Sequence, residues 1–378
     1  MLSSYEKTES ELHLFIIWNN GQKFKEQILD TIRKCLSIRL IKDLRWKEDE
    51  FSLNLRRFYG RNLPEKSDKA RECGLGLFTV IIVEDNSPIY APRYTNQGVQ
   101  VVNVHMFDMK DQFRRLVKSN VIHATNSQKE FEHDVTLLLG MNPTDLIANG
   151  FQSDISSDEY YSLCGTTGWK DIKELLYVLN STTNYVVLRN FENYPDSIQY
   201  GAHSDIDLLC ENYKTTQLLL NGEPTSTNRN RVQNKIMVGD SYINVDIRYI
   251  GDNYLDSKWE TDILMRRVLR QNGFYTPCDI DYLYSMTYHA LIQKSKISED
   301  YIVRTKELSK KLGIESLDLL NPSKCLSCLE DYMRKYNYEY VEPKDATVAY
   351  NFQKVHAKAG FSRRFHYLKH VVGHAIKG

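Results

Sequence analysis

Aspartate alternates with apolar residues in the segment HSDIDLL (203–209), and this alternation constrains the fold more than any other feature of the chain. Successive side chains of a β-strand point to opposite faces of a sheet. The pattern therefore predicts a strand with Asp205 and Asp207 on one face and apolar side chains turned into a core. At ~3.3 Å per residue, the two aspartates would lie about 6.6 Å apart along the strand.

A second predicted strand adds a third acidic residue. The segment INVDIRY (243–249) places Asp246 between two β-branched residues, just after a turn at Gly239 that suits a hairpin. A carboxylate within a buried strand costs free energy unless it is paired or ligates a metal ion. Asp205 and Asp207 alone would favour a turn or an exposed strand face over a metal site. With Asp246 on a neighbouring strand, the three predict a catalytic metal site for Mg²⁺ or Mn²⁺.

The stretch 170–260 resembles the polymerase-β-like nucleotidyltransferase superfamily. The segment VVLRNF (186–191) is a strand with a basic residue that precedes a short linker and the Asp-x-Asp strand. The resemblance implies transfer of a nucleotidyl or phospho-alcohol group, with two metal ions that clamp the triphosphate. The usual Gly-Ser pair is absent, so Arg189 and Ser204 are the expected phosphate-binding residues. For Arg189 the alternative is an ordinary surface arginine at a strand end.

Members of this superfamily transfer nucleotidyl groups to proteins, nucleic acids, antibiotics and sugars. A related branch moves phosphocholine or ribitol phosphate onto glycans. The resemblance therefore implies an activated nucleotide donor, but it leaves the acceptor open.

The first ~140 residues predict a small α/β unit. Apolar runs predict strands, and apolar residues at helical spacing predict helices. The strands are expected at 12–18, 38–46 and 75–85, and the helices at 24–36, 51–60, 109–117 and 128–140. This order is compatible with a ferredoxin-like sheet.

The segment KSNVIHATNSQKEFEHDVTLLLG (118–140) resembles the active-site stretch of nucleoside diphosphate kinases, where a strand delivers a nucleophilic histidine. The resemblance spans 11–140, gives that role to His123, and places Arg114 or Arg115 near a phosphate-binding arginine. It implies phosphoryl transfer through a neutral imidazole surrounded by cations. The family's Lys-Pro after the first strand is missing. The alternative is therefore a domain that kept the fold and lost the reaction.

The spacing becomes helical beyond about residue 255. Six lysines and arginines follow Asp345 without any acidic residue, although the whole chain has 49 of each sign. Residues 361–378 carry most of these six charges around an apolar stripe, which is typical of a basic amphipathic helix. Such a helix would bind an anionic membrane surface; the alternative is a helix docked on the body of the protein.

A polar segment at 141–163 interrupts the periodicity and predicts a domain boundary. The expected class is α/β (α+β), with a ferredoxin-like N-terminal domain, a mixed nucleotidyltransferase-fold sheet and a helical C-terminal region. The expected parts are a kinase-like domain at 1–142, a nucleotidyltransferase-like domain at 155–260, a helical extension at 261–345 and a basic arm at 346–378.

The sequence as a whole predicts a transferase of phosphorus-containing groups. The donor would be a nucleoside triphosphate or an activated nucleotide, and the acceptor a glycan or small molecule, as in bacterial surface-glycan biosynthesis. The balanced net charge predicts no specific nucleic acid. Two alternatives stay open: phosphoryl transfer through His123, and a non-catalytic nucleotide-binding sensor.

The expected location is the cytoplasm, with the basic arm allowing peripheral attachment to the inner face of the membrane. The N-terminus lacks the pattern of a signal peptide, and no apolar run reaches the ~18 residues of a membrane span. The 7 cysteines are scattered, which fits reduced thiols.

Overall fold

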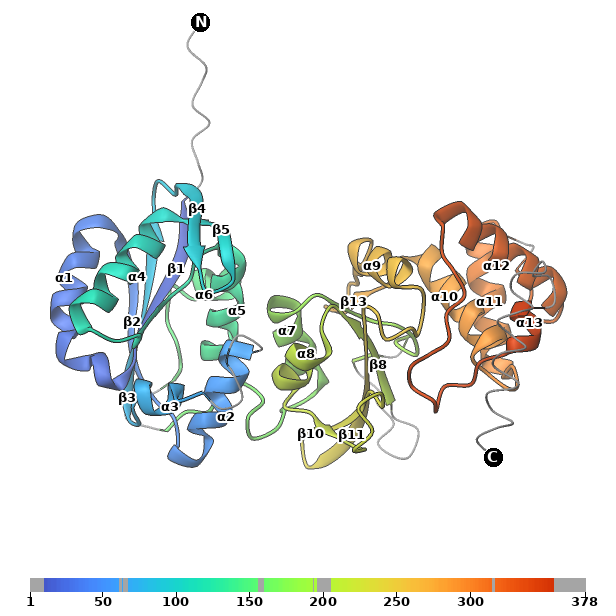
Figure 1. Cartoon of the computed structure of the whole chain (residues 1–378), viewed down its shortest axis with the longest axis horizontal. Helices are drawn as coiled ribbons and strands as arrows, with labels where there is room; N and C mark the ends of the chain where they lie inside the picture. The colour runs from blue at the N-terminus through green and yellow to red at the C-terminus, as the bar shows by residue number, and fades with distance from the viewer. Residues whose placement is uncertain are drawn as a thin grey trace, which may run out of the picture. The chain divides into compact units, whose positions relative to one another are not determined.

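The structure is a computed structural model that describes residues 10–60, 63, 67–155, 160–192, 194–195, 205–314 and 317–356. The chain divides into two compact units (Figure 1). The first consists of Met1–Thr183, Lys214–Gly222 and Met237–Ser241, and the second of Asn184–Tyr213, Glu223–Ile236 and Tyr242–Gly378. Each combines helices with β-structure, which confirms the mixed α/β class. The predicted boundary segment at 141–163 lies within the first unit.

A four-stranded antiparallel sheet forms the centre of the first unit, in the order β2-β3-β1-β6. Its central strand β1 is buried from His13 onward, as its apolar sequence predicts, and Ile16 is paired with His123. The strands are β1 (Glu11–Ile17), β2 (Ser37–Arg45), β3 (Leu77–Asp85) and β6 (Ile122–Ala124). The three strands predicted at 12–18, 38–46 and 75–85 are confirmed.

Helices cover both faces of this sheet, with α1 and α4 on one side and α5 on the other (Figure 1). The Ser127 hydroxyl accepts a hydrogen bond from Glu130 N at the start of α5, and Gly140 ends that helix with a φ of 67°. The helices are α1 (Lys25–Cys35), α2 (Glu48–Tyr59), α3 (Lys69–Cys73), α4 (Val104–Val117), α5 (Gln128–Leu139), α6 (Pro143–Ala148), α7 (Ile172–Thr182) and α8 (Tyr213–Leu220), with a 3₁₀ turn at Asn19–Phe24. The helices predicted in this region are thus confirmed.

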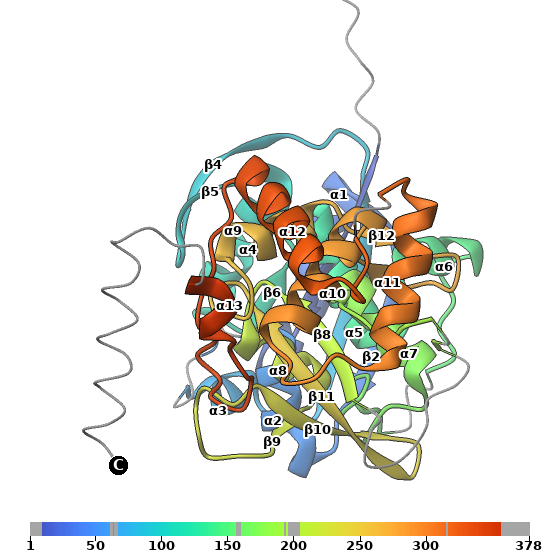
Figure 2. The same ribbon diagram turned by 90° about the vertical axis from the view of Figure 1, so that its right-hand side faces the viewer.

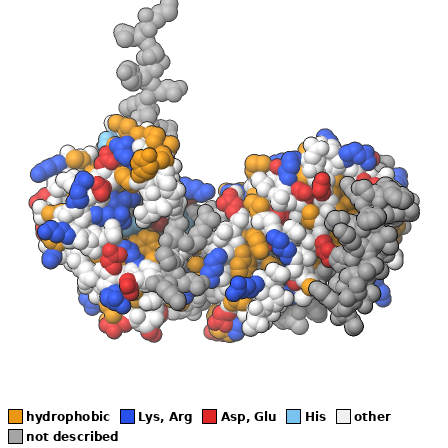
Figure 3. Space-filling view, in the orientation of Figure 1, with side chains coloured by type: hydrophobic (Ala, Val, Ile, Leu, Met, Phe, Trp, Pro, Cys, Tyr) orange, Lys and Arg blue, Asp and Glu red, His pale blue; other side chains and the backbone are white. Residues whose placement is uncertain are grey.

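A hairpin of β4 (Tyr90–Thr95) and β5 (Gly98–Asn103) was not predicted from the sequence. It bears exposed apolar side chains, among them Tyr94 and Val101, and Figure 3 shows hydrophobic side chains gathered over it. Pro92 and the polar residues around it interrupt the alternation of apolar and polar residues by which a strand is recognised in a sequence.

A five-stranded mixed sheet lies mainly in the second unit, in the order β7-β8-β11-β10-β9. The strands are β7 (Tyr185–Val187), β8 (Asp205–Cys210), β9 (Glu223–Pro224), β10 (Gln233–Val238) and β11 (Ser241–Tyr249). The Asp-x-Asp strand and the hairpin through Gly239 are confirmed. β7 ends four residues before the predicted 191, and Asn190 then adopts a φ of 60°, a left-handed conformation that breaks a strand.

Helices make up most of the rest of the second unit, and they lie together in Figure 2. The helix α10 is buried on every side from Asp281 onward, as its high content of apolar and aromatic residues favours. The elements are α9 (Ser257–Met265), the short strands β12 (Val268–Leu269) and β13 (Tyr275–Thr276), α10 (Asp279–Ile292), α11 (Glu299–Lys311), α12 (Pro322–Tyr336) and α13 (Phe352–His356). The helical pattern beyond residue 255 is confirmed.

The predicted basic helix at 361–378 lies outside the described residues, which end at His356 in α13. Among the helices that the structure does describe, none combines the length and the apolar content that a membrane span requires.

Candidate functional site

The three predicted metal ligands project from two adjacent strands of the mixed sheet. β8 and β11 run parallel, and their register pairs Asp207 directly with Asp246 and Asp205 with Asn244. Paired residues on neighbouring strands are about 4.8 Å apart and point to the same face. Asp205 shares that face because it precedes Asp207 by two residues. The structure thus brings Asp205, Asp207 and Asp246 together on one face of one sheet.

The apolar residues between the aspartates explain why the strands adopt this orientation. Ile206 and Leu208 of β8, and Val245 and Ile247 of β11, have no solvent exposure. A register shift by one residue would turn these side chains to the acidic face, so the core fixes the direction in which the carboxylates point.

The aspartates contain buried oxygens that lack a partner. One oxygen of Asp205 and one of Asp246 are buried without a hydrogen bond to any residue that the structure describes. Burial raises the pKa of Asp246, and the charges of Asp207 and Asp205 raise it further, whereas Arg248 lowers it. A buried carboxylate oxygen without a donor is costly, and a divalent cation would satisfy it. The donor set, made only of carboxylates, fits Mg²⁺ or Mn²⁺.

Arg189 forms a buried ion pair with Asp207 at a distance of 2.7 Å between Nη2 and Oδ1, and it also donates to the hydroxyl of Tyr254. Burial alone would lower the pKa of Arg189, but the charge of Asp207 raises it above its ordinary value. The arginine therefore stays charged and orients one of the three aspartates. Ser204, the other predicted phosphate-binding residue, lies outside the described residues.

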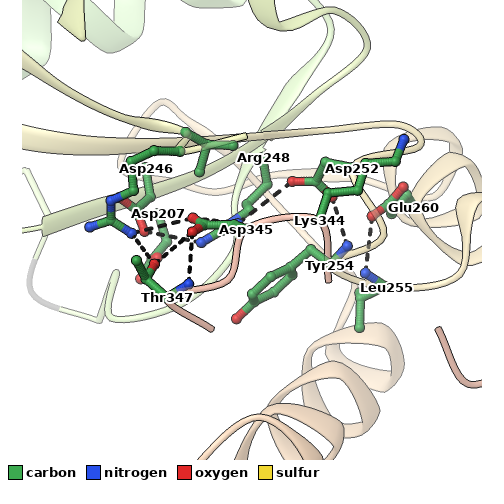
Figure 4. Close-up of polar contacts among 12 residues, drawn as sticks. Asp207, Asp246, Arg248, Asp252, Tyr254, Leu255, Glu260, Lys344, Asp345 and Thr347 are labelled. Atoms are coloured by element: carbon green, nitrogen blue, oxygen red, sulfur yellow. Dashed lines mark hydrogen bonds and ion pairs between the residues drawn. The ribbon is translucent and has the colours of Figure 1, made fainter. Parts of the chain in front are cut away.

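Arg248 connects the aspartate face to acids that were not predicted as part of the site (Figure 4). It lies 3.4 Å from Asp246, 3.4 Å from Asp345 and 3.8 Å from Asp252. Arg248 follows Asp246 by two residues in a predicted strand, so the sequence did contain a signal for it. Asp345 had none, because it lies in an irregular segment about a hundred residues further along the chain.

Negative charge exceeds positive charge in this region. Among the described residues, the five aspartates at 205, 207, 246, 252 and 345 are accompanied by three arginines at 189, 231 and 248. Acidic side chains therefore outnumber the arginines that accompany them, and this excess and the donor type both suit a metal ion on the aspartate face.

His123 lies in a separate pocket of about 590 Å³ in the first unit. Its Nε2 is 2.6 Å from Oδ2 of Asp134, and Nδ1 of His133 is 2.9 Å from the other oxygen of that carboxylate. Burial alone would raise the pKa of Asp134, but His123 and His133 lower it below its ordinary value. The rings of Phe58 and Tyr59 contact the imidazole edge to face. Asp134 was not predicted as a partner of His123.

The two arginines predicted near His123 do not line this pocket. Nε of Arg114 donates to the carbonyl of Ile122 at 3.0 Å, and Arg115 is exposed and pairs with Asp111 on its own helix. The structure therefore brings carboxylates to His123 but leaves Arg114 and Arg115 outside the pocket.

Among the described residues, the lysine and arginine side chains that line the pocket are Arg57 and Lys129. Arg57 is fully buried and donates to the carbonyls of Leu218 and Leu219 and to the hydroxyl of Thr166, so it holds α8 in place. Lys129 is exposed on the first turn of α5. Of the two, only Lys129 has its charge directed to solvent.

Comparison of the chain with protein-family models, curated proteins and solved structures finds no match.

Proposed function

We propose that the chain is a Mg²⁺- or Mn²⁺-dependent transferase of a nucleotidyl or phospho-alcohol group, with Asp205, Asp207 and Asp246 as metal ligands. One observation carries the proposal: the parallel register that sets Asp207 beside Asp246, with Asp205 on the same face. The mixed sheet supports a nucleotidyltransferase fold for this region. The strand order β2-β3-β1-β6 supports a ferredoxin-like fold for the first unit.

In this proposal each protein group has a defined task. A bound divalent ion supplies positive charge to the phosphates of the donor and orients them. Arg189 holds Asp207 in place, and Arg248 does the same for Asp246. These ion pairs fix the carboxylates before a metal ion arrives, which lowers the cost of organising the site.

A pocket of about 670 Å³ in the second unit is the proposed binding place for the acceptor. Phe191, Phe274 and Tyr282 provide aromatic surface. Three basic and three acidic side chains, several of them ion-paired, supply polar groups: Arg270, Arg304, Lys311, Glu192, Asp279 and Glu307. Aromatic faces beside a few polar groups are typical of small-molecule sites, and they suit the apolar face and hydroxyls of a sugar. Phe191 follows Arg189 by two residues, which connects the pocket in sequence with the aspartate face.

Phosphoryl transfer through His123 is the second candidate. The 2.6 Å contact with Asp134 favours it, because a carboxylate partner fixes one tautomer of the imidazole. Two observations count against it. The carboxylates of Asp134 and Glu130 would repel a phosphoryl group, and the guanidinium of Arg57 already donates its hydrogen bonds within the protein. We expect no acid-labile label on the protein after exposure to γ-labelled ATP. A label that disappears in His123→Ala would establish this second candidate.

The proposed cellular setting is the cytoplasm, with a glycan acceptor and an anionic membrane surface as partner of residues 361–378. It rests on the sequence resemblance and on the basic arm.

The transferase proposal is tested by incubating the full chain with α-labelled nucleoside triphosphates, Mg²⁺ and cell extract. Label should move to an acceptor, and Asp246→Asn should abolish the transfer. Asp240→Asn is the matched control, because Asp240 is exposed in the turn that precedes β11. Equal transfer by the Asp246→Asn and Asp240→Asn variants would disprove the assignment.

A further inference from the structure

We propose that the first unit holds a metal site of its own, made by His123, Glu130 and Asp134, and that it takes Zn²⁺ or another first-row transition-metal ion. One ligand atom of each residue lies within 4.8 Å of those of the other two. Among the described residues, no other group of three histidine, cysteine or acidic side chains has its ligand atoms this close together. It lies apart from the aspartate face in sequence and is independent of the transferase proposal.

The local fold explains why these three side chains converge. His123 is the middle residue of β6, and α5 begins at Gln128, only five residues later. Glu130 and Asp134 are four residues apart on α5, so they lie on the same face of the helix, one turn from each other. That face is turned to the strand, because all three residues line the same pocket.

The carboxylate of Asp134 is oriented by a neighbouring side chain, as metal-ligating carboxylates usually are. It is buried, and His133 Nδ1 contacts its Oδ1 at 2.9 Å, which leaves Oδ2 directed at His123 Nε2. Partners of this kind, on the far side of a ligating carboxylate, orient metal ligands in many sites. A metal ion would take the place of the proton that His123 and Asp134 share, and that proton would be released on binding.

Glu130 has one oxygen available for a metal ion. Its Oε2 accepts a hydrogen bond from the backbone N–H of Asn126 at 2.6 Å, as expected of a glutamate in the first turn of a helix that Ser127 caps. This bond occupies one oxygen, and the carboxylate is half-buried at the pocket wall. The capping hydrogen bond alone would account for a glutamate at position 130. It does not account for the contact between His123 and Asp134 beside this glutamate.

The composition of the site selects the metal. An imidazole nitrogen with two carboxylates suits Zn²⁺ or Mn²⁺, whereas Mg²⁺ and Ca²⁺ prefer oxygen ligands alone. Three protein ligands leave a fourth position open, as in catalytic zinc sites. The pocket of about 590 Å³ gives that position access to water or to an oxyanion, and Lys129 adds a positive charge at the pocket wall.

The test is calorimetric titration of Zn²⁺ into the full chain, stripped with a chelator and kept in excess Mg²⁺ so that the all-carboxylate face is saturated. We expect one tight site. His123→Ala and Asp134→Asn should weaken it by more than roughly 100-fold, and His133→Asn, which removes only the partner of Asp134, by roughly 10–100-fold. Glu130→Gln keeps an acceptor for Asn126 N, so it reports on metal binding with the helix cap preserved.

Two control variants make the result specific. His105 also contacts a carboxylate, with Nδ1 2.9 Å from Asp85, but it forms no group of three ligands with other described residues, so His105→Asn should bind Zn²⁺ normally. Cys328→Ser tests capture of zinc by a half-buried thiol and should also bind normally. Circular dichroism of each variant monitors the fold. Three outcomes would overturn the proposal. Zn²⁺ binding could survive in both His123→Ala and Glu130→Gln, it could disappear in Cys328→Ser, or it could be absent from the unaltered chain.

Discussion

Arg189 and Asp207 form a buried ion pair in which neither side chain is more than about a tenth exposed. Arg189 lies in the segment after β7 and Asp207 in β8, so the pair connects that segment to β8 beside the aspartate face. Asp207 is therefore both a candidate metal ligand and the counter-ion of a buried cation. Any substitution of Asp207 changes both roles at once.

Asp207→Asn should destabilise the fold. It leaves the Arg189 guanidinium buried without its counter-charge, and loss of one partner from a buried ion pair typically costs about 3–5 kcal/mol. The amide still offers an oxygen to Nη2, so we expect the lower end of this range. Urea unfolding followed by tryptophan fluorescence measures the change, with Asp240→Asn as the control. An unchanged unfolding midpoint would show that the pair contributes nothing to stability.

Asp205→Asn should separate metal binding from stability. Among the described residues, Asp205 carries a buried oxygen without a partner, and none of the ion pairs joins it to an arginine. Its removal also relieves repulsion with Asp246. In metal-free buffer the variant should therefore melt at the same or a higher temperature than the unaltered chain. Added Mg²⁺ should raise the melting temperature of the unaltered chain but not of the variant, because only an ion bound to the folded state stabilises it. Equal stabilisation of the two proteins by Mg²⁺ would remove Asp205 from the site.

The stability of the second unit should fall as the pH rises from about 5 to 9 because of Glu260. Burial, and then the charge of Asp252, raise the pKa of Glu260 to about 9. Between the ordinary glutamate pKa and this value, the folded chain binds a proton that the unfolded chain has released. The free energy of unfolding therefore decreases with pH, by at most ~1.4 kcal/mol per pH unit.

Urea unfolding at pH 5, 7 and 9 measures this slope, and Glu260→Gln should flatten it. The amide resembles the protonated acid and keeps an oxygen that accepts from the backbone of Gly251 or Leu255. A slope that is equally steep in the variant would assign the pH dependence to another group.

The sequence predicted those parts of the fold in which local pattern and burial agree. The strand β8 was predicted correctly, because Asp205 and Asp207 alternate with apolar residues that are fully buried. The hairpin of β4 and β5 was missed because it is exposed and contains Pro92. Its pairing depends on contacts across a turn and not on a buried face.

The sequence predicted only those residues of the candidate sites that a pattern within one segment marks. The strand pattern indicated Asp205, Asp207 and Asp246, and it predicted their common face. The partners of these aspartates could not be found this way, since the contact between Arg248 and Asp345 joins segments far apart in the chain. Asp134 has no local pattern that marks it as a partner of His123, because the contact arises only when the helix after Ser127 brings its carboxylate back to the imidazole.

Filling the pocket of the second unit should weaken binding of the acceptor while leaving the metal site intact. Leu308 lines that pocket from α11, and a tryptophan in its place would occupy part of the ~670 Å³. We expect Leu308→Trp to raise the KM for the acceptor at least roughly 10-fold, which corresponds to a loss of about 1.4 kcal/mol of binding free energy. The KM for the nucleotide donor and the response of the melting temperature to Mg²⁺ should stay the same. Val303→Trp is the matched control, because Val303 is on the same helix, is 48% exposed and does not line the pocket. If both tryptophan variants have the acceptor KM of the unaltered chain, the acceptor does not bind in this pocket. The acceptor would then have to reach the aspartate face from another part of the surface.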